Sequence, residues 1–461
     1  MKIKIKSSIK IILYFILTAL ILCIPALYNR YVLFYTDSAL YLESAMTLAP
    51  SLDRPIGYGF FIRATTWQTS LWYAIFMQGM IASLLIYHSL KTVLVHIGFK
   101  KIYHFLTLCI LVIFSTLGWY TSLLMPDVLT SFLILAVFNV IFGKNNIITY
   151  ILYSTLLFFI IFSHLSNFPI LLMILATLWL FILLKKTFAS YRKKTLYRTL
   201  LVLIVFLGTI TYLIKYNYDH YGKATISPTS GVFTFARLID TGVIDIYLRD
   251  NYDKKNYQIC QFKDDIPSSS QMFLWDLNGI FYKMGGWANY QEEPKIIVNN
   301  IFKSPKYYGT IVKDFSLSTL KQLLEFKVGD DLLNFTSESW RSVYDKIIQC
   351  YPKKEIKHEF CTSKQSKEEF KFDTLNDVIL LFVVLSLILI AFIVSRYKIH
   401  DKIYLFLVVN LSGVIFNAAV CANLSNVLNR YQARVVWIIP FIAIVLFLNY
   451  ILPRLISYIR K

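Results

Sequence analysis

Charged side chains gather in a polar loop, residues 30–69, that follows the first long apolar run of the chain. Asp37 comes a few residues after that run, and Asp53 and Arg54 lie in the middle of the loop. Charged groups beside hydrocarbon are costly unless something uses them, so the loop is a candidate functional site. A partly desolvated carboxylate suits a general base, and Asp37 is the candidate for that role. The structural alternative is that Asp37 caps the first of two short surface helices expected in the loop.

The second half of the loop presents a guanidinium group and an aromatic ring. Pro55 disfavours helical backbone at the residue before it, so we expect Arg54 on an extended segment. The planar fork of guanidinium donors suits phosphate, and Arg54 is predicted to contact one; its alternative role is contact with lipid headgroups. Gly57 and Gly59 remove bulk around Tyr58, which lets a ligand approach that ring or lets the turn pack closely.

Two further polar residues lie between later apolar runs. Asp127 precedes the fourth run, where it can converge with Asp37 on a divalent cation or an acceptor hydroxyl. Its alternative role is an N-cap for the helix that follows. His164 lies between the fifth and sixth runs and can donate to a phosphate oxygen. Helix capping and headgroup contact are its alternatives.

The last apolar run opens with two arginines. Arg430 and Arg434 are four residues apart and therefore share one face of a helix, with Tyr431 beside them. An anionic ligand would compensate these charges, so both arginines are predicted to bind phosphate and Tyr431 to contact substrate. Pairing with the carboxylates of Asp37 or Asp127 is the structural alternative.

The composition places these residues in a membrane protein. The chain has 461 residues, of which 57% are hydrophobic, and its mean hydropathy is +0.56, far above the range of soluble proteins. Ten apolar runs approach the roughly 20 residues that a helix needs to cross a bilayer. They cover residues 11–29, 70–90, 103–121, 128–143, 147–163, 168–184, 199–214, 375–395, 403–421 and 434–452.

These runs predict an all-α polytopic protein with about ten transmembrane helices, seven before and three after a long polar segment. The segment carries apolar residues at helical spacing, so we expect it to be mainly helical. The predicted units are a transmembrane core (1–214), an extracytoplasmic domain (215–375) and a C-terminal transmembrane segment (376–461). Two short amphipathic stretches in the first loop, 39–48 and 59–66, are predicted surface helices.

The distribution of charge predicts the orientation. The net charge is +20, and nearly all of the excess falls in segments that lie inside if the N-terminus is inside. Both termini are then cytoplasmic, and the long segment, whose charges nearly balance, is extracytoplasmic. The charge is thus a topology signal, and we expect no nucleic-acid partner. The predicted location is a bacterial inner (cytoplasmic) membrane.

Three cysteines lie in the long segment: Cys260, Cys350 and Cys361. An oxidising compartment permits one disulfide among them, and their spacing leaves the pairing open.

Taken together, the candidate residues resemble those of the GT-C superfamily of membrane glycosyltransferases, which includes the protein O-mannosyltransferases and the lipid A aminoarabinose transferases. In that family an acid follows the first span, as Asp37 does here, and a second acid lies in the next outer loop, like Asp127. The family's basic, proline-containing segment looks like residues 54–58, and its Arg-Tyr pair before a proline-containing late span looks like residues 430–440. The resemblance covers the first seven runs and the last one, but not 215–375.

The resemblance implies a transferase that moves a sugar from a polyprenyl-phosphate donor, itself a membrane lipid, to a glycan, lipid or protein acceptor with inversion. Asp37 would be the general base, and a divalent metal cation, where one is used, would lie between Asp37 and Asp127. The remaining candidates are Arg54, Arg430, Arg434 and His164 for the donor phosphate, and Tyr58, Tyr431 and Asp127 for the substrate.

Other classes stay open at this stage: a flippase or transporter of lipid-linked saccharides, a polysaccharide polymerase or ligase, and a noncatalytic assembly or receptor protein. Transporters place charges near the middle of the bilayer and often have two related halves. Here the charges gather at the ends of the runs, and the arrangement of seven and three runs shows no symmetry. The transferase hypothesis requires that Asp37, Arg54, Asp127 and Arg430 line one cavity.

Overall fold

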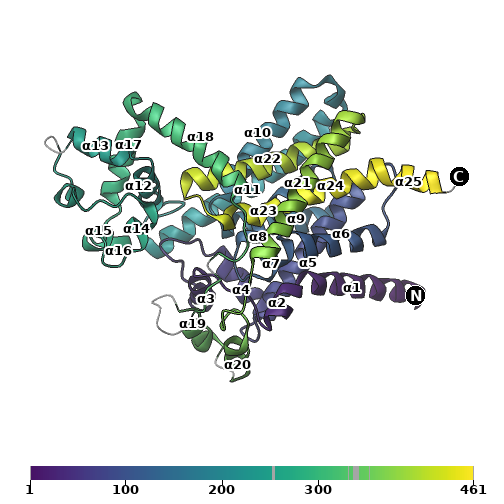
Figure 1. The fold of residues 1–461 in the computed structure, drawn as a ribbon, viewed down its shortest axis with the longest axis horizontal. Helices are drawn as coiled ribbons and strands as arrows, with labels where there is room; N and C mark the ends of the chain where they lie inside the picture. Colours follow the sequence, from purple (N-terminus) through teal and green to yellow (C-terminus); the bar gives the residue numbers. More distant parts are fainter. Residues whose placement is uncertain (1, 252–254, 331, 336–341, 352–353, 460–461) are drawn as a thin grey trace.

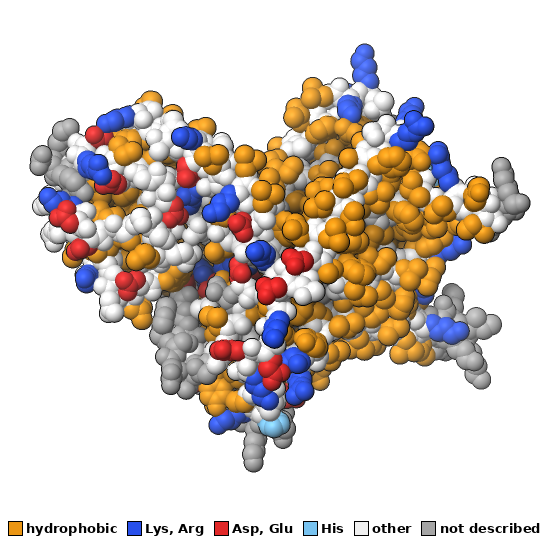
Figure 2. All heavy atoms as spheres, in the orientation of Figure 1, with side chains coloured by type: hydrophobic (Ala, Val, Ile, Leu, Met, Phe, Trp, Pro, Cys, Tyr) orange, Lys and Arg blue, Asp and Glu red, His pale blue; other side chains and the backbone are white. Residues whose placement is uncertain are grey.

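The computed structural model describes residues 2–251, 255–330, 332–335, 342–351 and 354–459, and every regular element within them is a helix. Long helices form a bundle, and both ends of the described chain lie at the same end of it (Figure 1). A unit of short helices lies at the opposite end (Figure 1). Hydrophobic side chains cover the bundle, whereas the helical unit shows mixed charges (Figure 2).

Several helices have the length and composition of membrane spans. Within the described residues, six qualify: α5 (Trp72–Val93), α10 (Asn167–Leu184), Lys186–Tyr221 with α11 (Arg192–Tyr221), α21 (Asp373–Arg396), α22 (Asp401–Leu424) and Asn429–Ile459. Four shorter apolar helices accompany them: Ile9–Leu22 within α1 (Lys2–Leu22), α6 (Lys101–Phe114), α8 (Asp127–Phe142) and α9 (Ile147–Ser163). The protein is therefore an all-helical integral membrane protein.

Each of the ten predicted apolar runs is helical, but three of them are interrupted. The first divides into α1 and α2 (Ile24–Asn29), where Pro25 lies in the first turn of the second helix and can donate no amide hydrogen. The third divides into α6 and α7 (Leu117–Ser122). The last divides into α23 (Asn429–Val436), α24 (Ile438–Leu446), a π-helical turn and α25 (Leu452–Ile459).

Helix α8 forms the centre of the bundle. Every one of its residues is buried, and it packs against α5, α9, α22 and α23. A helix that is apolar on all sides requires such surroundings. Because Asp127 is the first residue of α8, the packing of the bundle holds that carboxylate at the centre of one end.

The polar loop after α2 folds back onto the bundle. It forms the two predicted helices, α3 (Ser38–Thr47) and α4 (Gly57–Thr66), which pack against each other. The segment before α3 is fixed by backbone hydrogen bonds: the Leu33 amide donates to Ser122 (3.1 Å), and the Leu124 amide donates to Leu33 (2.8 Å). This pairing brings the chain that precedes Asp37 beside the chain that precedes Asp127.

The long segment after α11 divides between two hydrophobic cores. Helices α12 (Ser230–Asp240) and α17 (Glu292–Phe302), with the short helices between them and the start of α18 (Tyr308–Leu324), surround a core of their own. Farther along, α19 (Val343–Cys350) packs against α3, and its apolar residues join the core of the bundle. Helix α11 itself continues to Tyr221, beyond the predicted boundary at 214. The predicted domain 215–375 is thus built as two parts.

All six cysteines are free thiols in the structure. Cys350 is buried and its thiol lies 3.8 Å from the carbonyl oxygen of Leu42, whereas Cys361 is exposed. The disulfide that the sequence permitted is therefore not formed.

Substitution at Gly57 tests the packing of α4. A Cβ atom there would lie 2.4 Å from the carbonyl oxygen of Phe162, a backbone atom that cannot move alone. Gly57→Ala is therefore expected to destabilise the protein by about 1–3 kcal/mol, measured by thermal unfolding in detergent. Gly208→Ala is the control, because a Cβ at this helical position meets nothing within 4 Å. Equal stability of the two variants would contradict the close contact.

Candidate functional site

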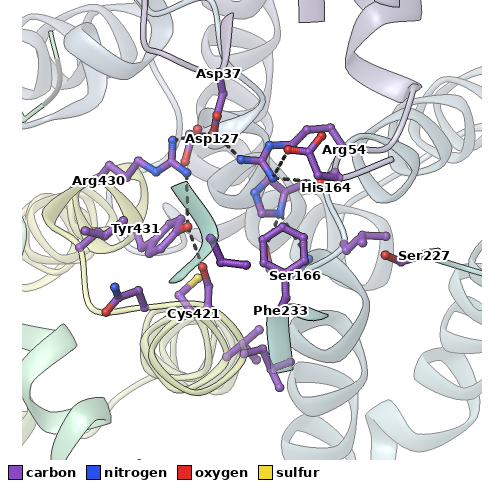
Figure 3. A pocket seen from close by; sticks show the side chains of 18 of the residues that line it. Asp37, Arg54, Asp127, His164, Ser166, Ser227, Phe233, Cys421, Arg430 and Tyr431 are labelled. Atoms are coloured by element: carbon purple, nitrogen blue, oxygen red, sulfur yellow. Dashed lines mark hydrogen bonds and ion pairs between the residues drawn. The ribbon is translucent and has the colours of Figure 1, made fainter. Parts of the chain in front are cut away.

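A cavity of about 520 Å³ lies where the helical unit meets the bundle. Its charged residues come from the loop before α3, the turn between α3 and α4, and the starts of α8 and α23, which are separate segments of the sequence. Helices α12 and α14 (Ser270–Trp275) form the facing wall, and the end of α22 completes it. Figure 3 shows Asp37, Arg54, Asp127, His164 and Arg430 gathered on one side of the space.

One carboxylate is shared by two guanidinium groups. The Nη2 atom of Arg54 lies 2.9 Å from Oδ2 of Asp37, and Nη1 of Arg430 lies 3.2 Å from the same oxygen (Figure 3). The side chains of Asp37, Arg54 and Arg430 are 7%, 16% and 12% exposed. Asp37 does occupy the N-cap position of α3, but its side chain makes no capping hydrogen bond. Its carboxylate therefore pairs with arginines in the cavity and does not serve as a cap.

A tight turn holds Arg54 in place. Its Nη1 atom donates to the carbonyl oxygen of Asp53 (2.9 Å) and lies 3.7 Å from the Asp53 carboxylate, which also accepts a hydrogen bond from Ser51. Burial disfavours the charged form of Arg54, but the nearby carboxylates of Asp37 and Asp53 outweigh it and raise its pKa above the ordinary value. Arg54 is thus a fixed positive charge at the cavity wall.

Arg430 is held between aromatic rings. Its guanidinium carbon lies 4.2 Å from the ring centroid of Tyr35 and 4.9 Å from that of Tyr431, within the range of cation–π attraction. Its Nη2 atom lies 3.3 Å from the hydroxyl of Tyr431, while its buried Nε atom has no hydrogen-bond partner among the described residues. Arg430 therefore keeps donor capacity although its side chain is well positioned.

The second acid pairs with an arginine that lies behind the cavity. Arg434 is fully buried, and its Nη1 atom is 3.4 Å from Oδ1 of Asp127. The same guanidinium donates to Asn417 (2.8 Å) and to Ser166 (3.0 Å). Asp127 lines the cavity but Arg434 does not. The structure thus does not place Arg434 where the predicted direct phosphate contact requires it; its contacts make it a support for Asp127.

His164 lines the cavity beside these pairs. Its Nδ1 atom is 2.8 Å from the hydroxyl of Ser166, and its Nε2 atom is 3.4 Å from Arg434. Burial and the positive charges of Arg434, Arg430 and Arg54 lower the pKa of His164 well below its ordinary value. At neutral pH the ring is therefore uncharged, and it offers a hydrogen bond without adding a positive charge.

Tyr58 lies in the core and not in the cavity. It is fully buried, and its hydroxyl donates to Gln78 (2.7 Å). The flanking glycines allow close helix packing, since a Cβ at Gly59 would meet Ser44 at 2.8 Å. The predicted substrate contact of Tyr58 is therefore not what its position supports. Tyr431, in contrast, lines the cavity.

The sequence did not indicate the wall opposite the arginines. Phe233, Thr234, Gln271, Leu274 and Trp275 contribute side chains to this wall. The helical spacing around Phe233 predicts a helix, but nothing local says which of its faces meets the bundle. Tyr35 was also missed, although its place two residues before Asp37 was a usable signal.

Asp37 and Asp127 are the predicted ligands of a divalent cation. In the part of the chain that the structure describes, no three His, Cys, Asp or Glu side chains come close enough to hold a metal ion. The two predicted metal ligands are already matched by positive charge, Asp37 by two arginines and Asp127 by one. The metal site predicted at Asp37 and Asp127 stays a prediction.

The cavity combines a charged corner with an apolar face. Leu165, Pro169, Val420 and Leu424 line it from α10, α22 and the loop before α10. Such a space can hold an amphiphilic molecule with a negatively charged head. The chain matches no family model, no curated protein and no solved structure.

The Asp127–Arg434 pair is expected to stabilise the fold. Arg434→Ala leaves the buried carboxylate of Asp127 without its partner, so we expect a loss of about 3–5 kcal/mol in denaturant unfolding of the purified protein. Adding Asp127→Asn to this variant should recover part of the loss, because the unpaired charge is removed. The control is Arg249→Ala, which breaks an exposed pair with Asp245 and should change stability by about 1 kcal/mol or less. A loss no larger than that of the control would contradict this role.

Proposed function

We propose that this protein is a membrane glycosyltransferase of the GT-C type, which moves a sugar from a polyprenyl-phosphate donor to an acceptor hydroxyl. One observation supports the proposal above all. Asp37, Arg54, Asp127 and Arg430, which belong to separate segments of the chain, line a single cavity that also has an apolar face.

The proposed topology has ten spans, with both termini cytoplasmic and the helical unit outside, in a bacterial inner membrane. The cavity lies at the starts of α8, α10 and α23 and the end of α22. Lysines occur at the other ends of these helices, for example Lys144, Lys185 and Lys402. Because positive charge favours the cytoplasmic side, this distribution supports an outward-facing cavity.

In the proposed reaction, Asp37 accepts the proton of the acceptor hydroxyl as its oxygen attacks the anomeric carbon. The bond between that carbon and the donor phosphate oxygen breaks, and its electron pair stays on the departing prenyl phosphate. The configuration at the anomeric carbon inverts because attack and departure take place on opposite faces of the sugar.

Arg54 and Arg430 are the proposed phosphate ligands. Both line the cavity and stand on either side of the carboxylate, so an incoming phosphate can take up their hydrogen bonds. Fixed positive charge at this position stabilises the negative charge that grows on the leaving group. A phosphate that draws both guanidinium groups toward itself also leaves Asp37 a stronger proton acceptor. Donor binding would thus activate the base.

The apolar face suits the prenyl chain. Leu165, Pro169, Val420 and Leu424 lie along the cavity, and Leu424 is half exposed at the rim of the bundle. Because the donor is a membrane lipid, its chain would enter from hydrocarbon, and these side chains would hold it by van der Waals packing and not by a transfer out of water. A transporter is less consistent with the site, because the charges lie at the helix ends and not midway along them.

Asp37→Asn is expected to reduce transfer by about 100- to 10,000-fold or more, since the amide keeps the size of the side chain but cannot accept the proton. The measurement is transfer in proteoliposomes supplied with lipid-linked sugars. Glu43→Gln is the control, because Glu43 lies on α3 but is exposed, pairs with Lys346 and does not line the cavity. Full activity of a correctly folded Asp37→Asn variant would rule out the assignment.

Arg430→Ala is expected to weaken donor binding. A charge-assisted hydrogen bond contributes about 1.5–3 kcal/mol, so the apparent donor KM should rise about 10- to 150-fold. Arg63→Ala serves as the control, because Arg63 donates to the carbonyl oxygens of Ala45 and Met46 and lies outside the cavity. An unchanged KM for Arg430→Ala would remove this residue from the phosphate site.

A further inference from the structure

Helix α18 joins the helical unit to the bundle. Its first half packs in the core of the unit through Ile311 and Phe315, and its second half runs against the end of α22, a candidate membrane span (Figure 1). From the sequence alone, this helix was predicted to lie in the extracytoplasmic domain, residues 215–375.

The inner face of α18 is held by polar contacts. Arg237 of α12 is buried; it pairs with Asp314 and donates to Ser318 (2.9 Å) and to the carbonyl oxygen of Ala422 (2.6 Å). The next residue, Thr319, accepts a hydrogen bond from Asn423 (3.0 Å). These contacts fix the rotation of the helix and hence which residues face outward.

The outward face changes character along the helix. In the first half the exposed side chains are mixed: Gly309, Lys313 and Ser316 occur together with Tyr308 and Val312, which are 44% and 63% exposed. In the second half it carries Leu317, Leu320 and Leu324, which are 57%, 60% and 79% exposed. Residues three, four and seven apart lie on one side of a helix, so these leucines form an apolar stripe that Lys321 interrupts.

We infer that the second half of α18 is embedded in the lipid of the membrane leaflet at the cavity end of the bundle. The stripe begins where the helix comes alongside α22, a candidate span of the bundle whose surface is covered by hydrophobic side chains (Figure 2). Three exposed leucines in water would be unfavourable, whereas in hydrocarbon each of them is stabilised. Lys321, four residues after Leu317 and three before Leu324, lies on the same face, and in the inferred position its long side chain would extend to the headgroups.

The placement also bears on the cavity. Gln322 of α18 is buried and clamps Leu428: its side-chain amide donates to the carbonyl oxygen (2.8 Å), and its own oxygen accepts from the backbone amide (3.0 Å). Leu428 lines the cavity and directly precedes α23, which carries Arg430. With its second half in lipid, α18 thus holds Leu428 in place and, through it, the start of α23 that carries Arg430 into the cavity.

The test places an environment-sensitive thiol fluorophore on the outward face, in a chain whose accessible cysteines are replaced by serine. The variants are Leu320→Cys, Leu324→Cys and the matched control Lys313→Cys, which lies on the same face one half of the helix away. Leu381→Cys, at an exposed position of α21, is the positive control for lipid contact. The labelled full-length proteins are reconstituted in phosphatidylcholine vesicles with and without brominated chains.

Brominated lipid should quench the labels at 320 and 324 several-fold more than the label at 313, and to an extent similar to the label at 381. Aqueous iodide should give the reverse order. Quenching of the 320 and 324 labels by iodide but not by brominated lipid would place the stripe in water and overturn the inference. Protection from both quenchers would also overturn it, because the stripe would then be covered by protein. Neither result bears on the proposed transferase activity.

Discussion

The sharing of the Asp37 carboxylate by Arg54 and Arg430 is the interaction on which the candidate site depends. Burying a charge is unfavourable unless it is paired, so three ionised groups that are nearly excluded from water must be held at contact distance. The surrounding structure does this from three directions. The backbone pairing at Leu33 fixes the approach to α3, the turn at residues 51–54 fixes Arg54, and aromatic rings fix Arg430.

Two charged clusters with similar residues take different roles because their burial differs. The arginines around Asp37 border the cavity, and their side chains are 16% and 12% exposed. The arginine next to Asp127 is fully enclosed, and Asn417 and Ser166 occupy its donors. The fully buried Asp127–Arg434 pair thus supports the cavity-lining cluster of Asp37 and its two arginines from behind. Neutral His164 lies between them and adds no further repulsion among the positive charges.

The helical unit belongs to the site as much as the bundle does. Its helices α12 and α14 supply one wall of the cavity, and Arg237 connects the unit to the end of α22 by a buried hydrogen bond. The inferred insertion of the second half of α18 into lipid would fix the distance between the helical unit and the membrane surface.

The sequence by itself determined the membrane class, the helical nature of the apolar runs, and the two short helices of the first loop, because composition and periodicity are local properties. It also indicated Asp37, Arg54, Asp127 and Arg430, since charges beside apolar runs are rare. Only the tertiary structure showed that Arg430 lines the cavity while Arg434 does not, and that Tyr58 is buried in the core. It also divided residues 215–375 between two hydrophobic cores and supplied the cavity wall with Phe233 and Trp275. Helical spacing defines a face, but distant segments decide whether that face meets a cavity, a core or lipid.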